Sequence, residues 1–262
     1  MYKRKIEYFL LEWKNDPDRK PLVIKGCRQC GKTSSVLEFA RKNYKNVIYM
    51  DFHEQKELCA LFEGSLQIDY LTVAISAAIP SARFEKGKTC LIFDEIQDCP
   101  HARSSLKFFK LDGRYDVICT GSLLGVNGYR TSDANYSVPV GFETIIDMNP
   151  MDFEEWLWAN GIQDSVIELL RTSLAEEKPV PKPIHDRMRQ LMLQYIVVGG
   201  MPEAVKKFFA THDINQVVAI QRNIVEEYKT DMVKYANHED RNRIRECFES
   251  IPRQLSKENK KF

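Results

Sequence analysis

The feature that most restricts the fold of this chain is the eight-residue stretch Gly26–Thr33, GCRQCGKT. It matches the pattern of a phosphate-binding loop, in which two glycines separated by four residues are followed by Lys and then Ser or Thr. Residues 21–24 form a short apolar run, as expected of a buried strand. Residues 34–40 have apolar side chains at helical spacing. The sequence therefore predicts a strand, a glycine-bounded loop and a helix in succession.

This loop is predicted to bind a nucleotide. The two glycines allow the backbone to turn so that successive N–H groups point into one hollow at a helix N-terminus. Lys32 can reach the β and γ phosphates, and the Thr33 hydroxyl can ligate Mg²⁺, which takes few protein ligands. The predicted nucleotide-binding residues are Gly26, Cys27, Arg28, Gln29, Cys30, Gly31, Lys32, Thr33 and Ser34.

A second informative stretch lies in Cys90–Glu95, where four apolar residues are followed by two carboxylates. Continuous apolar runs are typical of strands buried on both faces of a parallel sheet. Ligands bind beyond the carboxyl ends of such strands. We expect Asp94 to hold Mg²⁺, and Glu95 to polarise an attacking water as general base. The alternative is an ordinary strand capped by acids.

Another buried strand is predicted at 115–120, and Thr120 and Ser122 at its end are candidates for sensing a γ-phosphate. A turn after a strand is the simpler interpretation. Residues 126–139 are expected to form a loop, and residues 142–148 the last strand.

Past residue 150 the pattern changes to helices, beginning with a capping box formed by Asp152 and Glu155. The predicted organisation is a nucleotide-binding domain at 1–150 and a helical lid or linker region at 151–262.

Composition restricts the cellular environment. The 38 basic and 37 acidic residues give a net charge of +1, with no global attraction to nucleic acid or membrane. The N-terminus lacks the apolar core of a signal peptide. The longest apolar stretch, near residues 71–79, is too short to span a bilayer. We expect a cytoplasmic protein.

Seven scattered cysteines fit a reducing compartment. Cys27 and Cys30 have the two-residue spacing of redox and zinc motifs, although both lie inside the phosphate loop. Ordinary loop positions are the simpler interpretation, and a thiol switch is the alternative.

Five stretches in this order resemble a family of prokaryotic AAA-type ATPases whose nucleotide domain is followed by a C-terminal domain of unknown function. They are Gly26–Thr33, Leu91–Gln97, Thr120–Ser122, Pro150–Glu155 and Gly199–Glu203. The order of the motifs makes the resemblance specific, and it covers residues 1–262.

The resemblance implies an α/β fold of the P-loop NTPase type. A parallel five-stranded sheet, with the phosphate-loop strand in the middle, is sandwiched by helices and followed by an all-helical lid region. The implied cofactors are ATP and Mg²⁺. Lys32 and Thr33 would bind phosphate and Mg²⁺, Asp94 and Glu95 would serve Mg²⁺ and water, and Ser122 would be the sensor. A further C-terminal domain is also implied, and we expect the chain to be truncated before it.

The chain departs from the family where many relatives carry arginine after a glycine, because Phe142 follows Gly141 here. Candidates for a charge-neutralising arginine are Arg28, Arg103 and Arg130, or an arginine from a neighbouring subunit. An oligomer is therefore possible.

The leading functional hypothesis is a Mg²⁺-dependent ATPase that acts as a nucleotide switch for a C-terminal or partner module. The alternative is an ATP-gated binding module with negligible turnover that tethers DNA or a protein partner. The DNA partner rests on the resemblance alone. A small-molecule kinase is disfavoured, since residues 150–262 lack a convincing Arg-rich lid and the acid pair favours water as acceptor.

Overall fold

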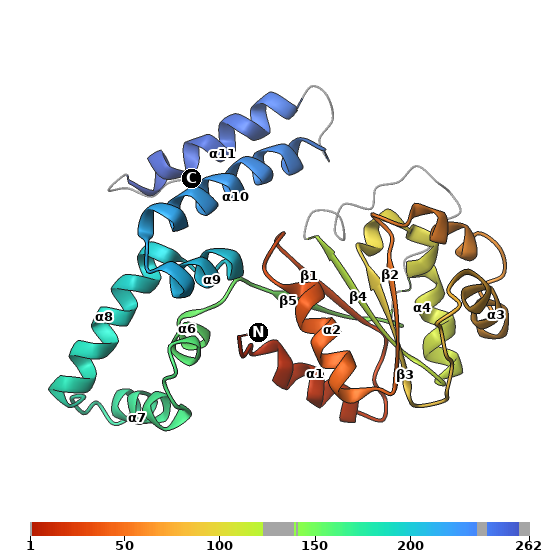
Figure 1. Ribbon diagram of the computed structural model, residues 1–262, viewed down its shortest axis with the longest axis horizontal. Coiled ribbons are helices and arrows are strands. Elements are labelled where there is room, and N and C mark those ends of the chain that lie inside the picture. The colour runs from red at the N-terminus through yellow and green to blue at the C-terminus, as the bar shows by residue number, and fades with distance from the viewer. Residues whose placement is uncertain (1, 123–138, 140, 235–239, 257–262) are drawn as a thin grey trace. The chain divides into compact units, whose positions relative to one another are not determined.

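The computed structural model describes residues 2–122, 139, 141–234 and 240–256 (Figure 1). The chain forms two compact units, Met1–Pro202 and Glu203–Phe262. The predicted boundary after residue 150 falls inside the first unit, where a sheet is followed by helices. A domain boundary at that position stays a prediction. Residues 126–138 of the expected loop lie outside the described residues.

The first unit is built on one five-stranded parallel sheet, ordered β2-β3-β4-β1-β5. Its strands are β1 (Leu22–Gly26), β2 (Asn46–Asp51), β3 (Thr89–Asp94), β4 (Asp116–Ser122) and β5 (Thr144–Met148). The α/β fold and the parallel sheet are confirmed. The phosphate-loop strand β1 is not in the middle, because β4 pairs between β1 and β3 and takes the central place.

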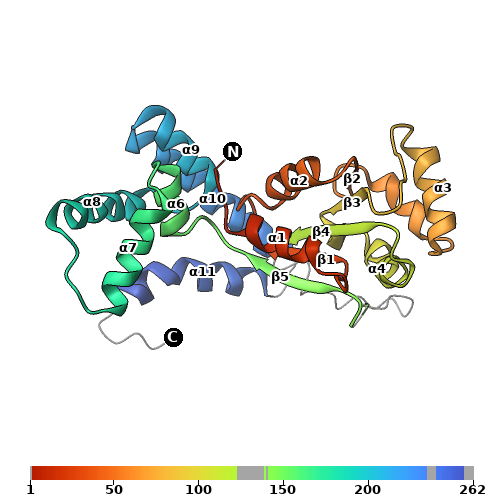
Figure 2. The same ribbon diagram turned by 90° about the horizontal axis from the view of Figure 1, so that it is seen from below.

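Helices cover both faces of the sheet, and α2 and α4 lie on opposite sides in Figure 2. One face carries α1 (Ile6–Asn15) and α2 (Lys32–Asn43). The other carries the 3₁₀ segment η1 (Lys56–Phe62), α3 (Ile68–Ala78) and α4 (Pro100–Asp112).

The apolar strand residues alternate between the two cores, as the period of a strand requires. In β3, Leu91 and Phe93 pack with α3 and α4, whereas Cys90 and Ile92 pack with α1 and α2. All four side chains are fully buried. The continuous apolar run in the sequence therefore reflects a strand that is covered on both faces.

The first unit continues with α6 (Phe153–Ala159), α7 (Asp164–Ala175) and α8 (Lys182–Val198). The predicted capping box is present, because Asp152 and Glu155 each accept from the other's backbone N–H. The second unit contains most of α9 (Pro202–Thr211), together with α10 (Ile214–Lys234) and α11 (Arg241–Leu255). Among the described residues, none of the helices has the length and apolar character needed to cross a membrane.

Gly200 allows the chain after α8 to approach the segment between β5 and α6. The N–H of Met151 donates to the Gly200 carbonyl at 2.7 Å. A Cβ at Gly200 would lie 2.0 Å from the Met151 carbonyl oxygen, so no larger residue fits without a backbone shift. This close contact connects the helices of the first unit to the strand beside β1.

Candidate nucleotide-binding site

The polar ends of the strands meet at one edge of the sheet. Gly26 at the end of β1 lies opposite Ser122 at the end of β4, and Asp51 at the end of β2 lies opposite Asp94 at the end of β3. The segment between β1 and α2 is the predicted phosphate loop, and it begins at this same edge. The structure thus places the start of the loop, Asp94 and Ser122 at the same edge of the sheet.

The loop contains two residues with left-handed backbone φ angles. Gln29 and Gly31 have positive φ angles of 61° and 96°. Gly31 is the N-cap of α2, which begins at Lys32. Left-handed residues next to a helix N-terminus create a concavity of backbone N–H groups that favours phosphate. Ser34 lies exposed in the first turn of α2.

Lys32 lies against the loop that precedes it. Its ammonium donates to the carbonyl oxygens of Gly26 at 3.1 Å and Cys27 at 2.8 Å, and the residue is only 6% exposed. A buried ammonium needs such acceptors. These carbonyls hold the Lys32 ammonium at the loop. A phosphate group bound there could replace them as the acceptor of its hydrogen bonds.

Asp94 is the centre of a hydrogen-bond cluster. Its Oδ1 accepts from the hydroxyls of Thr33, at 3.0 Å, and of Thr120, and its Oδ2 accepts from the hydroxyl of Tyr49 at 2.8 Å. The carboxylate is buried, so these donors offset the loss of water. Burial, and next the hydrogen bond to Asp94, raise the pKa of Tyr49 above its ordinary value, which keeps this hydroxyl a donor.

Tyr49 was not predicted from the sequence. It lies in β2, where a tyrosine among apolar residues is typical of an ordinary strand. The only signal was its position two residues before the polar end of the strand, at Asp51. Thr120 was predicted as a γ-phosphate sensor, and the structure places its hydroxyl on Asp94.

Glu95 has an unusual backbone. Its φ and ψ angles of 51° and 50° are left-handed, a conformation that costs a non-glycine residue on the order of 1–2 kcal/mol. Gln97 donates a hydrogen bond from Nε2 to Glu95 Oε2. Strained residues held by their surroundings are concentrated at functional sites. The turn directs the chain out of β3 at the sheet edge where Lys32 and Asp94 lie.

The oxygen donors at this edge fit a hard divalent cation. Thr33 offers a hydroxyl and Asp94 a carboxylate, and Mg²⁺ prefers such oxygens and keeps several waters. Among the residues that the structure describes, no cluster of three or more His, Cys, Asp or Glu side chains could hold a metal ion. Thr33 and Asp94 are the two residues here that could hold such a cation.

Two of the three arginine candidates can be placed in the structure. The Arg103 guanidinium forms a two-pronged ion pair with the Glu143 carboxylate, and both side chains are at most 5% exposed. It is therefore engaged in a structural contact beside β5. Arg28 lies in the loop itself, and Arg130 is outside the described residues.

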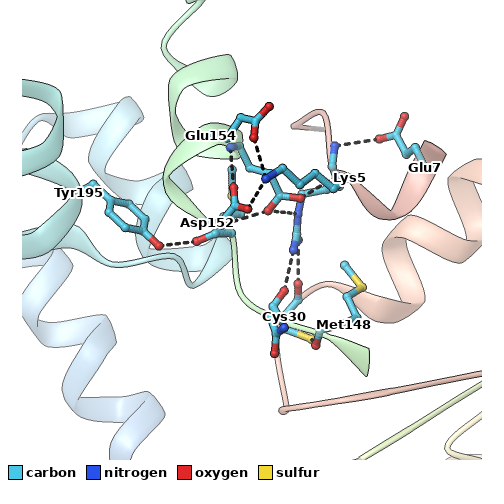
Figure 3. A network of polar contacts seen from close by, with 11 residues as sticks. Lys5, Glu7, Cys30, Met148, Asp152, Glu154 and Tyr195 are labelled. Atoms are coloured by element: carbon cyan, nitrogen blue, oxygen red, sulfur yellow. Dashed lines mark hydrogen bonds and ion pairs between the residues drawn. The ribbon is translucent and has the colours of Figure 1, made fainter. Parts of the chain in front are cut away.

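Arg4 joins the phosphate loop to α6. Figure 3 shows the polar network around this contact, with Cys30 and Asp152 labelled. Its guanidinium donates to the carbonyls of Cys30 at 2.9 Å and Asn149 at 2.7 Å. Its Nε lies 3.1 Å from Glu155 Oε2, and both side chains are 5% exposed. Glu155 also accepts from the backbone N–H of Lys5 at 2.7 Å. This contact was not predicted from the sequence, because the partners of Arg4 are distant along the chain.

Comparison with known families identifies two segments of the chain. A family model described as AAA domain matches residues 18–157. A model of a domain of unknown function (DUF8612) matches residues 189–262. None of the curated proteins matches the chain.

Two solved structures are similar in part. The structure of C. elegans PCH-2 is 10% identical, with a TM-score of 0.43 over 87% of this chain and 69% of that one. The structure of the Aeropyrum pernix ORC1 protein in complex with DNA is 13% identical, with a TM-score of 0.41 over 91% of this chain and 69% of that one.

We expect Arg4→Met to destabilise the protein by about 3–5 kcal/mol, because it leaves the buried Glu155 carboxylate without its charge partner. The double variant Arg4→Met/Glu155→Gln should regain most of that loss. Urea unfolding followed by circular dichroism measures both. Lys42→Met is the control, since its ion pair with Glu38 is exposed and contributes little. Equal unfolding midpoints for Arg4→Met and Lys42→Met would contradict the importance of the buried pair.

Proposed function

The chain belongs to the AAA-domain family, and from that premise we propose that it is a Mg²⁺-dependent ATPase whose nucleotide state controls its helical region. The observation that carries the proposal is the hydrogen bond between Thr33 and Asp94, whose positions are 61 residues apart. It joins the phosphate loop to the acidic end of β3. The two side chains lie 3.0 Å apart. A nucleoside triphosphate with Mg²⁺ needs a phosphate-binding loop and a carboxylate this close to each other.

In this proposal the loop binds the triphosphate. The N–H groups at the start of α2 and the Lys32 ammonium bind its phosphates. Thr33 and Asp94 would hold Mg²⁺, which when bound neutralises charge on the phosphates. The hydroxyls of Tyr49 and Thr120 keep the Asp94 carboxylate in place. They therefore orient a residue that would bind Mg²⁺ without touching the reacting atoms themselves.

Glu95 is proposed to accept a proton from the water that attacks the γ-phosphate. The left-handed turn at Glu95 supports this role, because it holds a carboxylate just beyond the end of β3. Gln97 donates to that carboxylate and restricts its orientation. Ser122, opposite Gly26 in the sheet, is proposed to contact the terminal phosphate as a sensor.

The switch role is supported by Arg4. Its guanidinium touches both the Cys30 carbonyl of the loop and the Glu155 carboxylate of α6. A change in the loop when phosphate binds or leaves therefore has a direct route to the first helix after the sheet. A local event can shift a distant element when such contacts have a second arrangement that the event favours.

The primary test measures ATP binding and phosphate release. Lys32→Ala should abolish binding, because it removes the loop's ammonium. Glu95→Gln should keep ATP affinity and lose turnover by a factor on the order of 10²–10⁴, as expected for a general base.

Lys88→Ala and Glu57→Gln are the matched surface controls and should match the parent. Glu95→Gln with parental turnover would reject the general-base role. A parent protein that binds ATP without single-turnover hydrolysis would indicate a nucleotide-gated binding module instead. Turnover with and without double-stranded DNA tests a DNA partner, and stimulation that vanishes in Lys32→Ala would support it.

Tyr49→Phe should raise the Mg²⁺ concentration needed for half-maximal turnover by roughly tenfold or more. Replacing a residue that orients a metal ligand commonly lowers metal affinity by at least that factor. ATP binding without Mg²⁺ should not change. Tyr8→Phe, at a half-exposed tyrosine on α1, is the control. Identical Mg²⁺ titrations for Tyr49→Phe and the parent would contradict the proposed role of this hydroxyl.

Hydrogen exchange followed by mass spectrometry tests the switch route. Adding ATP should change exchange in the first turns of both α2 and α6 in the parent protein. In Arg4→Lys, which keeps the charge but loses the two-pronged guanidinium, the response should persist in α2 and disappear in α6. An unchanged α6 response in this variant would exclude Arg4 as the connection.

A further inference from the structure

Two cysteines of the phosphate loop lie at the ends of one tight turn. Arg28 and Gln29 form the turn, and Cys27 and Cys30 are its first and last residues. The Cα atoms that flank such a turn are within about 7 Å of each other. A disulfide needs Cα atoms about 4.4–6.8 Å apart. A turn of this kind therefore brings its two end residues to about the separation that a disulfide needs.

The side chains are also in contact. A hydrogen bond with the Cys27 side chain, and then burial, raise the pKa of the Cys30 thiol, while the charges of Lys32 and Arg4 act in the opposite direction. Cys27 is half-buried, whereas Cys30 is fully buried with its Sγ 3.4 Å from the Met148 carbonyl. Cys27 is thus the thiol that a reagent in solution reaches first. Cys30 is placed to react afterwards with the modified Cys27.

A second cysteine pair in the chain provides a comparison. Cys59 and Cys99 also share a hydrogen bond, but burial, and after it the charges of Asp98, Glu63 and Glu57, raise the pKa of Cys59. Nearby cations and a helix N-terminus favour thiolate chemistry, and nearby acids oppose it. In the loop pair, Lys32 and Arg4 are positive neighbours of Cys30, although the hydrogen bond with Cys27 and burial outweigh their effect on its pKa. The neighbours that act on the Cys59 pKa are acidic instead.

We propose that Cys27 and Cys30 form a reversible disulfide that switches off nucleotide binding. The oxidant is a low-molecular-weight disulfide of the glutathione class. The Cys27 thiolate attacks one of its sulfurs and releases one thiolate, which takes up the proton that Cys27 lost. The Cys30 thiolate then attacks the Cys27 sulfur of the mixed disulfide. The second small thiol leaves and takes up the proton of Cys30, so two protein thiols are oxidised and one disulfide is reduced.

The packing indicates which end of the turn must move. Cys30 Sγ is fixed between the Met148 carbonyl and Gly26, where even a Cβ at Gly26 would lie 3.3 Å from the sulfur. Bond formation therefore draws Cys27 inward. The Cys27 carbonyl accepts the shorter of the two hydrogen bonds from Lys32. A displaced Cys27 thus moves both the loop backbone and the lysine that would bind phosphate.

This inference rests on the proposed function, since it regulates the same site. Coupling is reciprocal, so a disulfide that weakens ATP binding must itself be opposed by bound ATP. Couplings of ordinary size change affinity by roughly 5- to 150-fold. We expect oxidation to lower ATP affinity by a factor in that range, and saturating ATP to slow disulfide formation.

The experiment uses the full chain with Cys247→Ser as background, because this exposed cysteine would otherwise link molecules together. Protein is treated with oxidised or reduced glutathione. Peptide mass spectrometry identifies the disulfide, and fluorescent ATP titration measures affinity. We expect a bond between residues 27 and 30, reduced affinity, and recovery with reductant. Cys27→Ser should have an affinity that oxidant does not alter, whereas the control Cys59→Ser should respond like the background.

The outcomes separate the two proposals. A reduced protein that does not bind ATP overturns the proposed function, and the switch with it. A reduced protein that binds ATP but forms no bond between residues 27 and 30 overturns the switch alone. The same conclusion follows if the bond forms and affinity stays unchanged, or if Cys27→Ser remains sensitive to oxidant.

Discussion

The parallel register of the sheet is the constraint on which the site depends. Because all five strands run in the same direction, the residues that end them lie along one edge. Gly26 and Ser122 are opposite each other there, and the loop after Gly26 brings Thr33 within 3.0 Å of Asp94. Reversing β3 would carry Asp94 to the far edge without changing any local motif. The site is therefore a property of the topology as much as of the loop.

That edge collects groups that are costly to bury, and each has a local partner. Asp94 accepts from three hydroxyls, Lys32 donates to two loop carbonyls, and Glu95 accepts from Gln97. Buried polar groups need such partners. A phosphate would bind Lys32, and a metal ion would bind Thr33 and Asp94, so both would replace some of these hydrogen bonds. Ligand binding can then exchange one set of hydrogen bonds for another, which costs far less than leaving charges unpaired.

The sequence was sufficient for the features that a run of neighbouring residues encodes. The phosphate loop, the buried strand ending in Asp94 and the capping box before α6 are of this kind, and the structure contains all three elements. The resemblance implied that the phosphate-loop strand lies in the middle of the sheet, which is wrong for β1, and pairing depends on contacts between distant segments. Tyr49 and Arg4 were missed for the same reason. Tyr49 meets Asp94 across 45 positions, and Arg4 meets its carbonyl acceptors across 26 and 145, where no local periodicity records the contact.

Cys30 connects the chemistry of the loop to the rest of the first unit. Its sulfur lies against the carbonyl of Met148 in β5, and its own carbonyl accepts from Arg4, which also binds Glu155 in α6. A tightly packed interior passes on small displacements, so this residue cannot shift alone. Arg4 precedes the segment that the AAA-domain model matches, which begins at residue 18. The connection between loop and helices therefore uses a part of the chain outside the family pattern.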